Sequence, residues 1–125
     1  MSFLVKTAYM NKTLFFLLFI TFNTMAAVNC RTLDQAAQTH STHFENSHNG
    51  FSVIGKGRLY FHSAPDLRCK ESKVFIIPND KVNAYLDYHG YYYVMYFNRR
   101  GEQVEGWVDS NRLKENNTGI APVEK

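Results

Sequence analysis

Between Gly57 and Leu113 the sequence alternates apolar and polar residues in short runs, and turn-forming residues separate these runs. Leu59 and Phe61, for example, fall on one side of such a run, and their neighbours fall on the other. A period of two is typical of a half-buried β-strand. Several short strands in so short a span predict a small all-β barrel.

The N-terminal residues predict export. Residues 14–22 are mostly apolar, follow two lysines and precede small residues that end at Ala26. This run is shorter than the roughly 20 apolar residues of a membrane-spanning helix, and its layout is that of a signal peptide. We expect a signal peptide over residues 1–26, periplasmic localisation and no transmembrane anchor after cleavage; a retained single-helix anchor is the alternative. A signal peptide that begins at Met10 would be more usual than one that begins at Met1, so either methionine is a candidate for the first residue.

The two cysteines, Cys30 and Cys69, predict a disulfide. An exported chain with an even number of cysteines meets an oxidising compartment, where such a bond persists. The bond would tie the N-terminal segment to the barrel. Lipoprotein anchoring through Cys30 is the alternative, although Asn29 replaces the small residue that normally precedes a lipidated cysteine.

The charge is nearly balanced once the signal peptide is removed. All 11 acidic residues lie beyond residue 26, whereas Lys6 and Lys12 lie before it, which leaves 12 basic residues. A basic stripe that could neutralise phosphates is missing, so we expect no nucleic-acid partner. The remaining length suits one domain.

Residues 27–54 are polar and poorly periodic, and we expect a linker or a short helix that starts near Asp34. His40, His43 and His48 lie in this segment, and imidazole is a common metal ligand. These histidines have neither a regular zinc spacing nor a neighbouring cysteine, so we expect them to be solvated and predict no metal site.

Residues 55–114 contain the predicted strands of the barrel. Breaks in the pattern occur at Pro65, at Pro78 and at the pair His89-Gly90. The run that starts at Lys81 alternates most regularly, and the residues expected to point inward are Val82, Ala84 and Leu86. Residues 115–125 are expected to form a flexible tail.

Residues 91–97 are unusual because neither face of the predicted strand is polar. One face carries Tyr92, Val94 and Tyr96, and the other carries Tyr91, Tyr93, Met95 and Phe97. Only one face of a strand can look into a small barrel. The face with Tyr91 and Tyr93 therefore contacts either the N-terminal segment or a partner. A second copy of the chain is one such partner, so a homodimer is a further alternative.

The order of these motifs resembles the bacterial Src-homology-3 family over about half of the chain. The matching residues are Leu59, Phe61 and Pro65 in the opening strand, Asp80 and Val82 in a turn where Asn79 replaces glycine, Gly90, Tyr91 and Val94 in a strand where tyrosine replaces tryptophan, and Gly106, Trp107, Val108 and Leu113 at the close. The resemblance implies a partly open barrel of five to six strands after a mostly irregular N-terminal segment. It also implies that Trp107 lies against the barrel with its indole nitrogen at a wet edge.

The resemblance implies a binding protein. Members of this family bind peptidoglycan cross-bridges, peptides or other proteins, and some exported single-domain members act as immunity proteins against toxins. The sequence itself contains no partnered carboxylates at a recognisable spacing and no Ser/His/Asp order. We therefore expect neither an enzyme nor a cofactor.

Two hypotheses follow for the partner. In the first, a periplasmic immunity or inhibitor protein neutralises a toxin or another envelope-acting protein through an aromatic surface. Its expected contact residues are Tyr85, Tyr91, Tyr93, Arg99 and Arg100. In the second, a cell-wall module binds peptidoglycan in a groove. The expected groove residues are Tyr60, His62, Tyr85 and Trp107. The barrel is solitary in this chain, which favours the first hypothesis.

Overall fold

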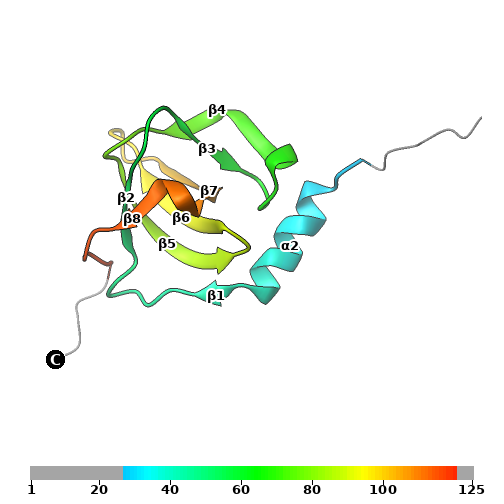
Figure 1. The fold of residues 1–125 in the computed structure, drawn as a ribbon, viewed down its shortest axis with the longest axis horizontal. Helices are drawn as coiled ribbons and strands as arrows, with labels where there is room; N and C mark the ends of the chain where they lie inside the picture. The colour runs from blue at the N-terminus through cyan, green and yellow to red at the C-terminus, as the bar shows by residue number, and fades with distance from the viewer. Residues whose placement is uncertain (1–26, 121–125) are drawn as a thin grey trace, which may run out of the picture.

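The computed structural model describes residues 27–120, in which one α-helix, eight strands and two 3-10 turns follow one another (Figure 1). In chain order these are α2 (Cys30–His40), β1 (Thr42–His43), β2 (Gly50–Val53), β3 (Leu59–His62), η1 (Leu67–Cys69), β4 (Lys70–Ile76), β5 (Lys81–Tyr88), β6 (Tyr91–Phe97), β7 (Gln103–Asp109), η2 (Ser110–Arg112) and β8 (Leu113–Glu115). The expected signal peptide lies outside the described residues. Within residues 27–120, no helix has the length and apolar character needed to cross a membrane.

The strands form one antiparallel sheet that curls into a half-barrel. Its order is β4-β3-β7-β6-β5-β2-β8, and β1 pairs with β5 beside this path. The prediction of a small, partly open all-β barrel is therefore confirmed. The sheet has more strands than the five to six expected, because the N-terminal segment contributes β1 and β2.

The inner face of the sheet holds the main core. Its largest fully buried side chains, all at most 1% exposed, are Val53, Phe61, Ile76, Val94 and Val108. Tyr92 and Tyr96 pack against this core from β6, on the same face as Val94. The alternation along β6 that the sequence indicates is thus present, and its other face points away from the barrel interior.

Leu86 does not lie on the inner face, contrary to the sequence expectation. β5 pairs with β6 at Ala84↔Val94 and next at Leu86↔Tyr93, so β5 advances two residues where β6 advances one. The extra residue, Tyr85, forms a bulge, which reverses the alternation that follows it. Leu86 therefore packs on the outer face with Trp107, whereas Val82 and Ala84 join the main core as expected.

Helix α2 covers part of the outer face of the sheet (Figure 1). A second apolar group, which we call the helix-covered cluster, lies between the helix and the sheet. Its members are Ala37 of the helix, Leu86 and Trp107, with Tyr85, Tyr88, Tyr91 and Tyr93 packed around them. The helix begins at Cys30, earlier than the expected start near Asp34. Asn29 determines this start because its side chain accepts a hydrogen bond from the Thr32 backbone N–H.

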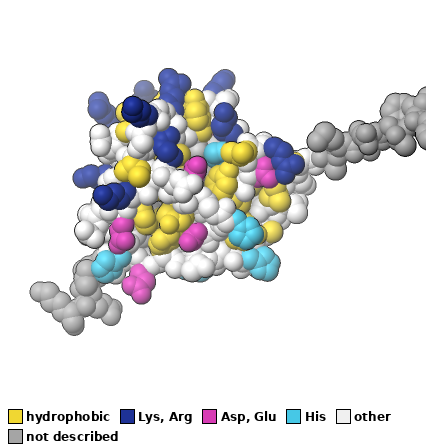
Figure 2. Space-filling model, in the orientation of Figure 1, with side chains coloured by type: hydrophobic (Ala, Val, Ile, Leu, Met, Phe, Trp, Pro, Cys, Tyr) yellow, Lys and Arg dark blue, Asp and Glu magenta, His cyan; other side chains and the backbone are white. Residues whose placement is uncertain are grey.

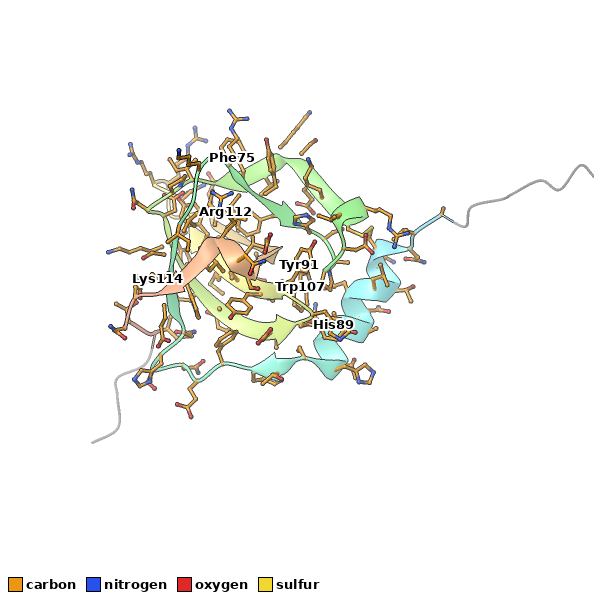
Figure 3. The ribbon with its side chains drawn as sticks, viewed as in Figure 1. Phe75, His89, Tyr91, Trp107, Arg112 and Lys114 are labelled. Atoms are coloured by element: carbon orange, nitrogen blue, oxygen red, sulfur yellow. A yellow bond between two sulfur atoms is a disulfide. The ribbon has the colours of Figure 1, made fainter. Side chains whose placement is uncertain are left out.

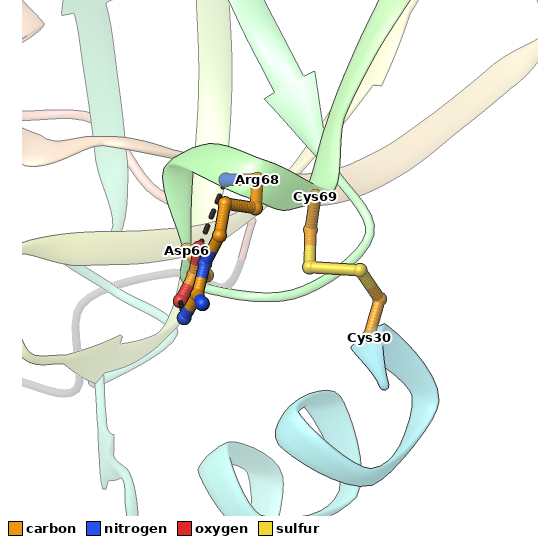
Figure 4. Close-up of polar contacts among 4 residues, drawn as sticks. All are labelled: Cys30, Asp66, Arg68 and Cys69. Carbon is orange, nitrogen blue, oxygen red and sulfur yellow. Dashed lines mark hydrogen bonds and ion pairs between the residues drawn. A yellow bond between two sulfur atoms is a disulfide. The ribbon is translucent and has the colours of Figure 1, made fainter. Parts of the chain in front are cut away.

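The predicted disulfide is confirmed. Cys30 and Cys69 are bonded with their Cα atoms 5.8 Å apart, and the bond joins the first turn of α2 to the end of η1 (Figure 4). The two cysteines are 39 residues apart in the chain. The N-terminal segment is therefore fastened to the barrel covalently at one end of α2 and through the β1–β5 pairing beyond its other end.

Residues 116–120, which were expected to belong to a flexible tail, are hydrogen-bonded to the start of β2 and to the segment before it. The Gly50 N–H donates to the Thr118 carbonyl at 2.8 Å, and the Ile120 N–H donates to the Asn46 carbonyl at 2.9 Å. A side chain at Gly119 would meet the backbone of Asn46 and Ser47, so glycine permits this close approach.

Candidate functional site

Trp107 lies beneath α2 and not at a wet edge (Figure 3). Its side chain is 0% exposed, and its indole Nε1–H donates to Asp34 Oδ1 at 2.8 Å. The expectation of a solvent-facing indole nitrogen is wrong because α2 excludes the solvent and supplies the acceptor itself. Trp107 is thus a structural residue that joins the helix to β7.

Tyr91 and Tyr93 are half-buried against the same cluster. The Tyr93 hydroxyl donates to Glu105 Oε2 at 3.0 Å, and burial together with this hydrogen bond raises the pKa of Tyr93. Burial, followed by the negative charge of Asp109, raises the pKa of Tyr91. The chain's own N-terminal segment therefore covers much of the surface that the sequence offered as an interface.

The His62 side chain is also buried. It is 6% exposed, its Nδ1–H donates to the Trp107 carbonyl at 3.2 Å, and its ring meets the Tyr91 ring edge-on at 5.3 Å. Its Nε2 has no hydrogen-bond partner in the part of the chain that the structure describes. With His62 and Trp107 buried, and with β7 and β6 between the strands of Tyr60 and Tyr85, the expected glycan groove is not formed.

Arg99 and Arg100 are exposed in the turn between β6 and β7. This turn follows the end of β6, whereas Tyr91 begins that strand. Arg100 Nη1 lies 3.9 Å from Glu102 Oε1, an exposed contact that adds little stability. The two arginines therefore do not border the tyrosines they were expected to accompany.

The outer face of the β3–β4 hairpin brings aromatic and cationic side chains together. The Tyr60 and Phe75 rings pack edge to face with their centroids 5.9 Å apart. Arg58 Cζ lies 4.2 Å from the centroid of Phe75, and Lys70 Nζ lies 4.8 Å from that of Tyr60. Both distances are within the range of cation–π attraction. We call these four residues the cation–aromatic cluster.

The cation–aromatic cluster is accessible. Arg58, Lys70 and Phe75 are exposed, the last to 37%, and Tyr60 is half-buried. Figure 3 shows Phe75 at the border of the molecule, away from α2 and Trp107. In Figure 2 most Lys and Arg side chains in view lie along this border and continue down the adjoining flank, while most His side chains in view lie toward the opposite border.

The turn that joins β3 to β4 is held firmly. Asp66 accepts hydrogen bonds from the Arg68 backbone N–H at 2.8 Å and from Arg68 Nε and Nη2 at 2.9 and 2.8 Å (Figure 4). These bonds, with the positive charge of Arg68, hold the pKa of Asp66 at about 2. Together with the disulfide at Cys69, they fix the turn end of the hairpin that carries the cation–aromatic cluster.

A second surface feature is a hollow of about 320 Å³ beside β1. It is lined by Thr42, His43, Phe44, Glu45, His48 and Asp87. The fold thus brings His43 and His48 to one place, but no group of three or more His, Cys, Asp or Glu side chains within residues 27–120 is arranged to hold a metal ion. The hollow offers hydrogen-bonding groups without a defined ligand geometry.

Of the residues in the cation–aromatic cluster, only Tyr60 was expected from the sequence to contact a partner. Arg58 could have been found with it, since Arg58 directly precedes β3 and both residues alternate with the inward Leu59 and Phe61. Lys70 and Phe75 could not, because their place beside Tyr60 depends on the irregular pairing of β4.

No family model, no curated protein and no solved structure matches this chain.

Proposed function

We propose that this chain is an exported, non-enzymatic binding protein that acts in the periplasm as an immunity or inhibitor protein. It neutralises a toxin or another envelope-acting protein by docking on it. The observation that carries this proposal is the exposed cation–aromatic cluster on the β3–β4 hairpin. The disulfide supports export, because such bonds persist in oxidising compartments.

The cluster has the composition of a protein-binding hot spot. Aromatic residues and arginine are enriched where interfaces carry most of their energy. The two rings and two cations of the cluster hold one another in place, so little side-chain freedom remains to be lost on binding. The cluster contains neither a carboxylate nor an imidazole, and binding is the role that its groups support.

The proposed aromatic binding surface lies on the β3–β4 hairpin and not on β6, where the sequence predicted it. The sequence favoured the strand of Tyr91 and Tyr93, but these side chains pack beneath α2. Peptidoglycan binding has less support, since two of its four expected groove residues, His62 and Trp107, are buried. The experiment below distinguishes peptidoglycan binding from binding of a protein partner.

The test uses the full chain, expressed in the periplasm with a C-terminal affinity tag. We compare the wild type with Arg58→Gln/Lys70→Gln and with a control, Lys81→Gln/Lys114→Gln, which changes two exposed lysines of β5 and β8. The proposal expects one stoichiometric protein partner that the first variant loses and the control keeps. It also expects the partner alone to arrest growth and co-expression of the chain to restore it. Sedimentation of the chain with purified peptidoglycan and no protein partner would overturn the proposal.

A further inference from the structure

The position of Lys70 depends on a bulge in β4. β3 pairs with β4 at Tyr60↔Phe75 and then at His62↔Lys70, so β3 advances two residues while β4 advances five. In a regular strand, residues five apart point to opposite faces. The bulge brings Lys70 onto the face of Phe75, where its Nζ lies over the Tyr60 ring. Bulges often re-aim side chains beside functional sites.

Within residues 27–120, the exposed cations of this hairpin other than Arg68 have no acidic partners. Among residues 27–120, ion pairs are formed only by Arg68 with Asp66 and by Arg100 with Glu102. Arg58 and Lys70 are exposed and have no such pair, and neither have the neighbouring exposed residues Lys56 and Lys73. Glu71 is the one acidic residue of β4. The hairpin therefore gathers positive charge that nothing within the described chain neutralises.

We infer that the protein partner presents an acidic surface, with at least two carboxylates that dock on Arg58 and Lys70; this inference rests on the proposed function. Charge complementarity of this kind steers association and selects partners. Arg58 can bind one carboxylate through two parallel hydrogen bonds, and Lys70 offers a point charge to a second. The Tyr60 and Phe75 rings supply the apolar contact between them.

The same geometry disfavours a nucleic acid as the occupant. Bases bind proteins by stacking on aromatic ring faces, yet Arg58 and Lys70 lie over the faces of Phe75 and Tyr60. The chain beyond residue 26 is also nearly neutral, with 12 basic against 11 acidic residues, so it lacks the excess positive charge that binds phosphates.

The experiment measures binding of the full chain to poly-L-glutamate at low salt, with polyphosphate of equal charge and anionic vesicles as comparison probes. The variant Arg58→Glu/Lys70→Glu is compared with Lys81→Glu/Lys114→Glu, which changes the net charge equally. Arg58→Gln/Lys70→Gln serves as a milder second variant, and thermal unfolding checks that each variant is folded.

We expect the wild type and the Lys81/Lys114 variant to bind poly-L-glutamate alike, and the Arg58/Lys70 variants to bind at least about tenfold more weakly. Equal weakening in both charge reversals, tighter binding of polyphosphate or vesicles, or no binding by the wild type would overturn the inference. Capture of a protein partner that survives Arg58→Glu/Lys70→Glu would contradict the inference and the docking surface proposed above, while the role as an inhibitor of that partner would stand. Intact poly-L-glutamate binding without any protein partner would contradict the proposed function and leave the charge preference standing.

Discussion

At the scale of single residues, the pair Asp66 and Arg68 determines the electrostatics of the turn between β3 and β4. Asp66 caps η1 by accepting from the Arg68 N–H, and the guanidinium of Arg68 binds the same carboxylate. The hydrogen bonds favour the ionised carboxylate, so its pKa falls from 3.8 to about 2. This contribution to stability is present above pH 3.8 and is lost as the pH falls through about 2.

Arg68→Ala should therefore raise the pKa of Asp66 toward its ordinary value of 3.8. The reason is that both the side-chain hydrogen bonds and the nearby positive charge are removed. An NMR titration of the Asp66 carboxyl carbon measures the change, and Lys73→Ala on β4 is the control. An Asp66 pKa that stays near 2 in Arg68→Ala would mean that another group causes the shift.

Asp34 is the second residue whose role can be measured. Asp34→Ala leaves the buried Trp107 N–H without an acceptor, which should lower the free energy of unfolding by about 1–3 kcal/mol. Asp34→Asn keeps an acceptor oxygen and should lose clearly less. Urea unfolding followed by the fluorescence of Trp107, the single tryptophan of the chain, gives both values. Equal losses in the two variants, or none, would contradict the assigned hydrogen bond.

At the scale of elements, α2 depends on the disulfide because its sequence provides little apolar surface. Ala37 is its one buried residue, and Leu33 remains 37% exposed. Its polar residues explain why the sequence predicted only a linker or a short helix. The helix is stabilised by contacts with Cys69 and Trp107, which lie far along the chain. The local sequence of the helix does not predict these contacts.

Removing the disulfide should destabilise the fold. In the chain-entropy account, a closed loop of this length stabilises by about 4 kcal/mol, so Cys30→Ser/Cys69→Ser should lose up to that amount. Chemical denaturation with and without a thiol reductant measures the loss. The wild type should fall to the stability of the variant when reduced, while the variant should not respond to the reductant. A reduced wild type as stable as the oxidised one would contradict this role.

The strands show where sequence reasoning succeeds and where it ends. Alternation correctly predicted the inward Val82 and Ala84 and the two faces of β6. It failed at Leu86, which follows a bulge in β5, and it could not place Lys70, which a bulge separates from Phe75 in β4. A bulge reverses the alternation, and the residue types do not reveal it. The fold was thus largely predictable from the sequence, whereas the candidate site was not.

At the scale of the whole molecule, two regions of the sheet's outer face differ in their exposure to solvent. One is closed by α2, which buries Trp107 and half-buries the neighbouring tyrosines. The other, on the β3–β4 hairpin, is open, aromatic and positively charged (Figure 2). Beyond residue 26 the chain is nearly neutral, and the cations Arg58 and Lys70 stand beside aromatic rings on one hairpin; this combination suits one oriented partner better than general binding of polyanions.

Photo-crosslinking in the native cell envelope, with a benzophenone amino acid placed at Phe75 or at Phe97, would show directly whether a partner docks on the cation–aromatic cluster. Both side chains are exposed, at 37% and 56%, but Phe75 belongs to the cluster and Phe97 ends the tyrosine strand β6. We expect a single protein adduct from position 75 and none from position 97. An adduct from position 97 alone, or crosslinking only to peptidoglycan, would contradict the proposed docking surface.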